Sequence, residues 1–185
     1  MLKNSKLEST IGIAHTRWAT HGKPSKVNSH PHLDNSGKIS VVHNGIIENY
    51  KELREKLEKQ GCTFRSQTDT ETVAHLVASK FAQVKDLTEA VRLATKEIEG
   101  AYALCVIHQD VKDTIVATRR NAPLLVGIGE GEYYLASDVP AIIQHTKKAM
   151  YIDDNQIVTL TPNSIKYIDA DKNILEPKIE HLPWE

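Results

Sequence analysis

Three short stretches near the start of the chain carry side chains that could bind and activate a small polar molecule. Residues 15–22 read His-Thr-Arg-Trp-Ala-Thr-His-Gly, and residues 43–49 read His-Asn-Gly-Ile-Ile-Glu-Asn. An arginine can bind a carboxylate through two parallel charge-assisted hydrogen bonds, and a carboxamide beside a glycine can stabilise an oxyanion. Thr-Asp-Thr-Glu at 68–71 supplies an acid that could hold an ammonium group. Together the stretches suit a small zwitterion, but they contain no nucleophile.

Each of these residues also has an ordinary structural interpretation. An isolated Arg17 would more often form a structural salt bridge, but Thr20 and His21 beside it in a polar loop favour carboxylate binding. Asn44-Gly45 after a strand is a strong hairpin signal, although the residues that follow predict a helix and not a returning strand. Asp69 precedes a predicted helix, where it could be an N-cap, and a carboxylate there could still bind an amine.

The composition indicates a single globular domain and excludes several classes of function. The chain has 185 residues, a hydrophobic fraction of 40% and a formal net charge of −1. This near-neutral charge gives no electrostatic reason to expect a nucleic-acid partner. No apolar run reaches the roughly 18 residues of a membrane-spanning helix, and Met1–Lys6 have no signal-peptide character. We therefore expect a cytoplasmic protein with no membrane partner.

The cysteines and histidines do not predict a metal site or a cofactor. Cys62 and Cys105 form no CxxC motif, and Cys105 lies in an apolar run that reads as a buried strand. Five histidines lie between positions 15 and 43 (His15, His21, His30, His32 and His43), yet no Cys, Asp or Glu there has zinc-ligand spacing. Gly127–Gly131 is not a dinucleotide fingerprint, because no helix follows it. A histidine metal site on a structural domain stays a minor alternative.

Hydrophobic periodicity predicts blocks of helices followed by blocks of strands. We expect a strand over Ile11–Thr16, a functional loop over Arg17–Pro31 and a strand over Ile39–His43. Helices are predicted from Asn49 to Gly61, with Asn49 and Glu52 as a capping box, and over Thr70–Ala82 and Asp86–Ile98. Strands follow at 101–108, 113–118, 124–128 and 132–136, then a short helix through His145 and a closing hairpin over 150–160 and 164–168. This order favours a layered α+β fold.

The motifs resemble those of one family. The strings HTRWATHG and VHNGIIEN, with Asn28–His32 and Thr68–Glu71, are similar to the glutaminase domain of the glutamine–fructose-6-phosphate aminotransferases, which are class II glutamine amidotransferases. The similarity runs across essentially the whole chain. The resemblance implies the αββα sandwich of the N-terminal-nucleophile hydrolases. It also implies hydrolysis of L-glutamine to glutamate and ammonia by an N-terminal cysteine, for glucosamine 6-phosphate synthesis in a separate sugar-isomerase domain.

The resemblance also implies a role for each matching residue. Arg17, Thr20 and His21 would bind the α-carboxylate of L-glutamine. Asp69 would bind the α-ammonium with help from Gly45, and Asn44 with the Gly45 N–H would form the oxyanion hole. Trp18 matches a residue thought to gate the ammonia route, although an ordinary packed tryptophan is an equal alternative. No cofactor is implied.

The sequence departs from the family pattern at its beginning. Family members begin Cys-Gly-Ile-Val-Gly, whereas this sequence begins Met1-Leu2-Lys3. We therefore interpret residues 1–185 as a type-2 glutamine amidotransferase domain truncated at both ends, without its N-terminal strands and helix and ending at the linker to an absent sugar-isomerase domain. As given, it should show no glutaminase activity, and exposed sheet edges should favour a homo-oligomer. The alternative is a non-catalytic module that binds glutamine or glutamate.

Overall fold

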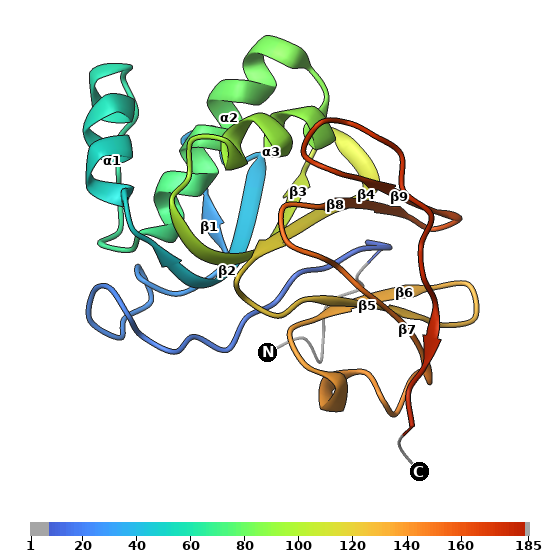
Figure 1. The fold of residues 1–185 in the computed structure, drawn as a ribbon. Helices are drawn as coiled ribbons and strands as arrows, with labels where there is room; N and C mark the ends of the chain where they lie inside the picture. The colour runs from blue at the N-terminus through green and yellow to red at the C-terminus, as the bar shows by residue number, and fades with distance from the viewer. Residues whose placement is uncertain (1–7, 184–185) are drawn as a thin grey trace.

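Two antiparallel sheets and one layer of helices make up the computed structural model, which describes residues 8–183 (Figure 1). Two parts of the sequence lie outside this range. They are Met1–Lys6, which have no signal-peptide character, and Trp184 and Glu185 at the end of the predicted linker. The larger sheet has the strand order β1-β2-β3-β4-β8-β9, and the smaller has the order β10-β7-β5-β6. The predicted α+β class is confirmed.

The larger sheet is the central layer. Its strands are β1 (His32–Leu33), β2 (Ile39–Ile47), β3 (Gly100–His108), β4 (Val111–Arg120), β8 (Ile157–Thr161) and β9 (Ser164–Ile168). β2 and β3 pair over their whole length, from Ile39 opposite His108 to Ile47 opposite Gly100. The smaller sheet contains β5 (Leu125–Ile128), β6 (Tyr133–Ala136), β7 (Lys148–Tyr151) and β10 (Glu180–His181).

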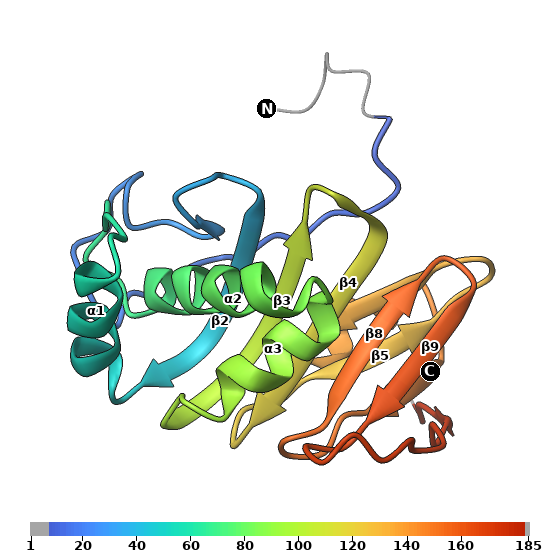
Figure 2. The same cartoon turned by 90° about the horizontal axis from the view of Figure 1, so that it is seen from above.

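The helices cover the outer face of the larger sheet (Figure 2). They are α1 (Tyr50–Lys59), α2 (Thr70–Val84) and α3 (Leu87–Thr95). On the other side of the molecule, the smaller sheet carries only the 3₁₀ turn η1 (Val139–Ala141) as helical structure within residues 8–183. The second helical layer of the predicted sandwich is therefore not formed by this part of the chain. None of the described helices combines the length and apolar character needed to cross a membrane.

Strand β3 shows why the larger sheet is buried on both faces. Tyr102, Leu104 and Val106 face the helices in one apolar cluster, and Ala103 faces the smaller sheet in a second cluster, with Cys105 packed against it. Alternate side chains of a strand point to opposite faces, so both sets of residues must be apolar. This confirms the prediction that the run over 101–107 is a strand covered on both faces.

Three predicted details of the elements are wrong. Residues 11–16 form no strand; this irregular segment crosses the underside of the larger sheet (Figure 1). Residues 150–160 do not form one strand, because β7 joins the smaller sheet and β8 the larger, where it makes the hairpin with β9. Asn49 does not cap α1: its amide donates to the Glu97 carbonyl at 2.8 Å and accepts from the Glu99 N–H at 3.0 Å. The Asn49 side chain therefore bonds to backbone groups that are distant in sequence and not to the first turn of α1.

Asp86, where the third predicted helix starts, is the N-cap of α3, and this gives a test of the helix's stability. The Asp86 side chain accepts a hydrogen bond from the Glu89 N–H at 2.7 Å. Replacing an N-cap with alanine typically costs about 1 kcal/mol. We expect Asp86→Ala to lower the free energy of unfolding by about that amount in urea denaturation, whereas Asp86→Asn, which keeps an acceptor, should change it little. Equal losses in both variants would contradict a capping role.

Candidate functional site

The three stretches singled out in the sequence meet at one cavity of about 360 Å³. The second half of β2 forms one wall, the irregular segment that precedes β1 forms another, and the start of α2 closes the end. The lining residues are His15, Arg17, Trp18, Thr20, His21, His30, His43, Asn44, Gly45, Ile46, Thr68, Asp69 and Thr70. All six residues predicted to bind glutamine or an oxyanion therefore face the same space.

Asn44 and Gly45 lie inside strand β2 and form no turn, so the hairpin alternative is wrong. Gly45 adopts a φ of +117°, and a Cβ there would lie 2.1 Å from the Ala101 carbonyl oxygen. Only glycine can hold this conformation at so close an approach between strands. The Asn44 side chain is exposed toward the cavity, and its Oδ1 lies 2.5 Å from His15 Nε2.

Asp69 occupies the N-cap position of α2, but its side chain bonds elsewhere. Its side chain makes no capping bond to α2, although only 2% of the residue is exposed. Instead its Oδ2 accepts a hydrogen bond from the Ile47 N–H at 2.8 Å. Its Oδ1 lies 3.8 Å from Nδ1 of His21. The buried carboxylate thus ties α2 to the end of β2 and leaves one oxygen toward the cavity.

Arg17 makes no ion pair within the described residues, so the alternative of a structural salt bridge is not seen there. Its guanidinium donates to three successive carbonyls of its own loop: His21, Gly22 at 3.0 Å and Lys23 at 3.3 Å. A guanidinium has five N–H donors, so these bonds leave two of them. Arg17 therefore shapes its own loop and has two N–H donors that these three bonds do not use.

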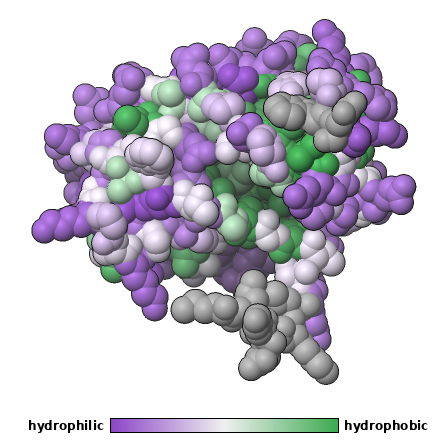
Figure 3. Space-filling view, turned by 90° about the horizontal axis from the view of Figure 1, so that it is seen from below, coloured by the Kyte–Doolittle hydropathy of each residue, from purple (hydrophilic) through white to green (hydrophobic). Residues whose placement is uncertain are grey.

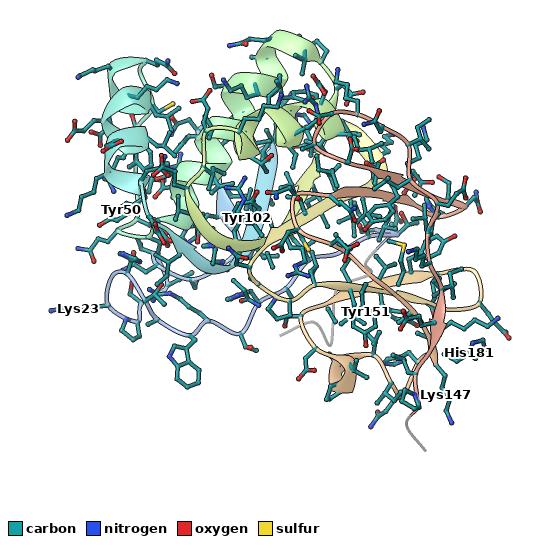
Figure 4. The ribbon with its side chains drawn as sticks, in the orientation of Figure 1. Lys23, Tyr50, Tyr102, Lys147, Tyr151 and His181 are labelled. Atoms are coloured by element: carbon teal, nitrogen blue, oxygen red, sulfur yellow. The ribbon has the colours of Figure 1, made fainter. Side chains whose placement is uncertain are left out.

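His21, Thr20 and Trp18 stand at the rim of the cavity. The His21 ring packs edge-on against Tyr50 at the start of α1, with 4.9 Å between ring centres. In Figure 4, Lys23 marks the outer end of this loop and Tyr50 the helix above it. Trp18 is 89% exposed, which rules out the alternative of an ordinary packed tryptophan in this structure. Thr20 is also exposed.

Three other histidines, His15, His30 and His43, line the cavity, and His32 packs behind His30. Burial disfavours the charged form of His30, His32 and His43. The His15 and His30 rings stack at 4.2 Å. Burial, together with the neighbouring histidines, lowers the pKa of His30 to about 3. Burial also lowers the pKa of His43 to about 4 and that of His32 below its ordinary value. His43 Nδ1 contacts the Thr70 hydroxyl and His32 Nε2 the Thr68 hydroxyl, each at 2.9 Å.

These contacts leave the histidines engaged with protein groups. No set of three or more His, Cys, Asp or Glu side chains among residues 8–183 is arranged to hold a metal ion. The five clustered histidines were the sequence signal for this part of the site, but their spacing did not reveal what they do. The structure shows four of them stacked on one another or hydrogen-bonded to hydroxyl and amide groups, and the fifth, His21, packed against Tyr50.

Two buried side chains, Asn28 and Glu71, support the site from behind, and no sequence pattern indicated these roles. Asn28 accepts from the Gln67 N–H at 2.9 Å and donates to the Lys23 carbonyl at 3.0 Å, which joins the two loops. The Glu71 carboxylate accepts from the N–H groups of residues 65 and 66, at 2.8 and 2.6 Å, and from the Ser66 hydroxyl. Both lie in the motifs that carry the family resemblance, and the structure shows that they position the neighbouring loops.

Neither cysteine lines this cavity. Cys105 lies in a neighbouring cavity of about 260 Å³, which shares His15, His43 and Asn44 with the first and is otherwise largely apolar. Figure 3 shows apolar residues around a hollow on the underside of the molecule. Burial raises the pKa of Cys105 to about 12 and also raises that of Cys62, so both thiols are held protonated.

Comparison with known proteins identifies the family. A model of the glutamine amidotransferase domain matches residues 3–183. Similar curated proteins are the glutamine–fructose-6-phosphate aminotransferases (isomerizing) of Clostridium perfringens, 50% identical over all of the chain, and of Streptomyces coelicolor, 48% identical over 96% of it. That of Methanothermobacter thermautotrophicus is 47% identical over 96%. The chain spans about 30% of the length of these relatives.

Two solved structures confirm the fold. One is the glutamine phosphoribosylpyrophosphate amidotransferase of B. subtilis in complex with ADP and GMP, with a TM-score of 0.72 and 23% identity over 86% of this chain and 35% of that one. The other, described as the allosteric regulatory enzyme of purine biosynthesis, has the same TM-score and 25% identity over the same shares. The arrangement of sheets is thus that of the N-terminal-nucleophile amidotransferases.

The lowered pKa of the buried Glu71 leads us to expect that the protein loses folding stability in acid. Burial alone would raise its pKa, but hydrogen bonds from His75, Ser66 and two backbone N–H groups lower it from 4.5 to about 2. A carboxyl group whose pKa is lower in the folded state stabilises the fold above its unfolded pKa. This shift corresponds to about 3 kcal/mol. The contribution should be lost as the pH falls from 4.5 to about 2.

The test is urea denaturation of wild type and Glu71→Gln across this pH range. We expect the variant to be less stable by about 3 kcal/mol at neutral pH, with a difference that shrinks in acid. Glu52→Gln is the control, because Glu52 is exposed on α1. A difference between wild type and Glu71→Gln that does not change with pH would show that the Glu71 charge is not responsible.

Proposed function

The chain belongs to the glutamine amidotransferase domain family, and from this we propose that it is the glutamine-hydrolysing domain of a glutamine–fructose-6-phosphate aminotransferase. The observation that carries the proposal is the single cavity that places a guanidinium, a buried carboxylate and an Asn-Gly pair around the same space. These groups match the carboxylate, the ammonium and the reacting amide of L-glutamine. The 30% coverage of the named relatives leaves their sugar chemistry to residues outside this chain.

In the proposal, Asp69 and Arg17 bind the two charged ends of the amino acid. Asp69 Oδ1 accepts from the α-ammonium, because Oδ2 is already held by the Ile47 N–H. Gly45, which has no side chain to block this wall, helps to receive the ammonium. The remaining Arg17 donors bind the α-carboxylate, with the Thr20 hydroxyl and His21 at the rim. Charge-assisted hydrogen bonds of this kind fix orientation as well as affinity.

The reacting amide of glutamine would then lie against Asn44 and Gly45. The Asn44 side-chain N–H and the Gly45 backbone N–H donate to the oxyanion that forms when a nucleophile attacks the amide carbon. Cys62 and Cys105 lie outside the cavity. The proposal therefore assigns binding and oxyanion stabilisation to this chain, and the attack to the N-terminal cysteine that the family resemblance implies.

Further parts of the proposal concern the domain and its partners. We assign residues 1–185 to one glutamine amidotransferase domain that delivers ammonia to a sugar-isomerase domain. The exposed Trp18 at the cavity rim suits a gate on that route. We also propose a cytoplasmic location and a homo-oligomeric state, which fit the metabolic activity for which the relatives are named. Gel filtration with light scattering would test the oligomeric state.

One observation favours the alternative of a non-catalytic module that binds glutamine or glutamate. The cavity has binding groups, yet neither cysteine of the chain is placed to attack a bound amide. The two functions differ in one measurement, which is the release of glutamate from L-glutamine. It is made on the full-length protein, meaning the protein that contains this domain in the proposal. Release favours the enzyme, whereas binding without release favours the module.

Asp69→Asn should separate recognition of the ammonium from the fold. Asparagine keeps an oxygen for the Ile47 N–H but loses the charge. We expect about 10- to 100-fold weaker binding of L-glutamine by calorimetry, and unchanged binding of glutaramic acid, which lacks the α-amino group. Asp86→Asn, remote from the cavity, is the control. Equal weakening for both ligands would show that Asp69 does not bind the ammonium.

Asn44→Ala should act on the rate and not on binding. Loss of one oxyanion donor typically lowers kcat by about 10²- to 10³-fold. We expect that loss in glutamate release by the full-length protein, with a KM for glutamine close to that of wild type, because the donor acts mainly in the transition state. A higher KM with unchanged kcat would remove Asn44 from the oxyanion hole.

A further inference from the structure

We propose that His15 is a positioning residue that turns the Asn44 carboxamide so that its NH₂ group faces the reacting amide, and that His30 holds His15 in place by stacking. The inference rests on the proposed function for its catalytic meaning. The contact on which it is built, between His15 Nε2 and Asn44 Oδ1 at 2.5 Å, is a feature of the structure itself.

The chemistry of the contact fixes which atoms carry hydrogen. A carboxamide oxygen is only an acceptor, so Nε2 of His15 must be the donor. The oxygen and nitrogen of a carboxamide point in different directions from one carbon. Once the oxygen is bound to His15, the NH₂ group is left for another acceptor. Asn44 lines the cavity, so a developing oxyanion there can receive that hydrogen bond.

His30 contacts both the ring of His15, which carries the donor, and the backbone of strand β2 next to Asn44. Its ring stacks on His15 with 4.2 Å between centres and 19° between planes. Its Nδ1 accepts a hydrogen bond from the backbone N–H of His43 at 3.3 Å, immediately before Asn44 in β2. One ring thus locates both His15 and the backbone next to the carboxamide. Burial lowers the pKa of His30 to about 3, which keeps this ring neutral and able to accept.

The role of His15 is confined to Asn44 in this structure. Nδ1 of His15 is buried and has no hydrogen-bond partner in the described part of the chain. The bond to Asn44 is therefore the one polar contact of the ring there. A residue that acts through only one neighbour should lose its effect when that neighbour is removed. A residue that touches the substrate itself should not.

A double-mutant cycle in the full-length protein tests this difference. His15→Phe keeps a ring to stack on His30 but removes the donor. We expect it to lower kcat for glutamate release by about 10- to 100-fold, less than the complete loss of Asn44, with a KM within about twofold of wild type. In the Asn44→Ala background, the same change should cost nothing further. Equal fold-losses in both backgrounds would overturn the proposal.

Two variants separate positioning from a general loss of structure. His15→Gln returns an N–H donor at about the reach of Nε2 and should recover much of the lost kcat. His145→Phe is the matched control, because His145 also stacks on an aromatic ring, Tyr134 of β6, but lies in the turn before β7 and does not line the cavity. It should leave kcat unchanged. A folded His15→Gln that is as slow as His15→Phe would count against a hydrogen-bonding role.

A measurement on the unmodified 185-residue chain needs neither activity nor a stable variant. Long-range ¹H–¹⁵N NMR spectra report which imidazole nitrogen carries hydrogen. We expect His15 to be protonated on Nε2, and the Asn44 side-chain amide signals to shift on addition of L-glutamate. His15 protonated only on Nδ1 would overturn the proposal. Absence of glutamate release in the full-length protein would instead defeat the proposed function and leave this result standing.

Discussion

The close approach of strands β2 and β3 at Gly45 is the constraint on which the site depends. β2 is paired with β3 throughout, and its φ of +117° at Gly45 brings the backbone to a place where a Cβ would collide with the Ala101 carbonyl. The strand can therefore continue to Ile47 while Asn44 and Gly45 face the cavity. Any other residue would have to move β3, whose side chains belong to both major apolar clusters. The packing of the apolar core and the geometry of the cavity therefore both depend on Gly45.

The loops of the site are held by side chains and not by regular structure. Arg17 binds three carbonyls of its own loop, Asn28 joins that loop to residue 67, and Glu71 binds the N–H groups of residues 65 and 66. Unpaired backbone groups are costly when they are buried, so these polar side chains are needed wherever no strand is available. They also restrict motion of the ligand groups, which lowers the entropy lost on binding.

The sequence predicted the elements with strong periodicity and the residues of the cavity. Helices over Thr70–Ala82 and Asp86–Ile98, and the strand covered on both faces at 101–107, are present because their apolar patterns describe contacts that the whole fold makes. Predictions from local sequence were wrong where a side chain forms its hydrogen bonds with residues distant in the sequence. Asn49 resembled an N-cap, but Glu97 and Glu99, some 50 residues away, take both ends of its amide.

The same limit explains what could not be predicted about the site. Asp69 resembled a cap, but the Ile47 N–H is its partner. The His15 contact with Asn44 joins residues 29 apart in sequence, and no periodicity encodes it. The cluster of histidines was visible in the sequence, whereas their stacking and hydrogen bonds depend on how an irregular segment crosses beneath the sheet (Figure 1).

The electrostatic character of the cavity follows from which groups are allowed to keep a charge. Burial holds His30 and His43 neutral, with pKa values of about 3 and 4. A charged His43, which interacts electrostatically with Asp69, would compete with the ammonium of the proposed ligand for that carboxylate. With these two histidines neutral, the carboxyl group of Asp69 and the guanidinium of Arg17 are left as groups of opposite character in the cavity lining. A fixed pair of opposite charges across a small space complements a zwitterion more closely than it complements a simple cation or anion.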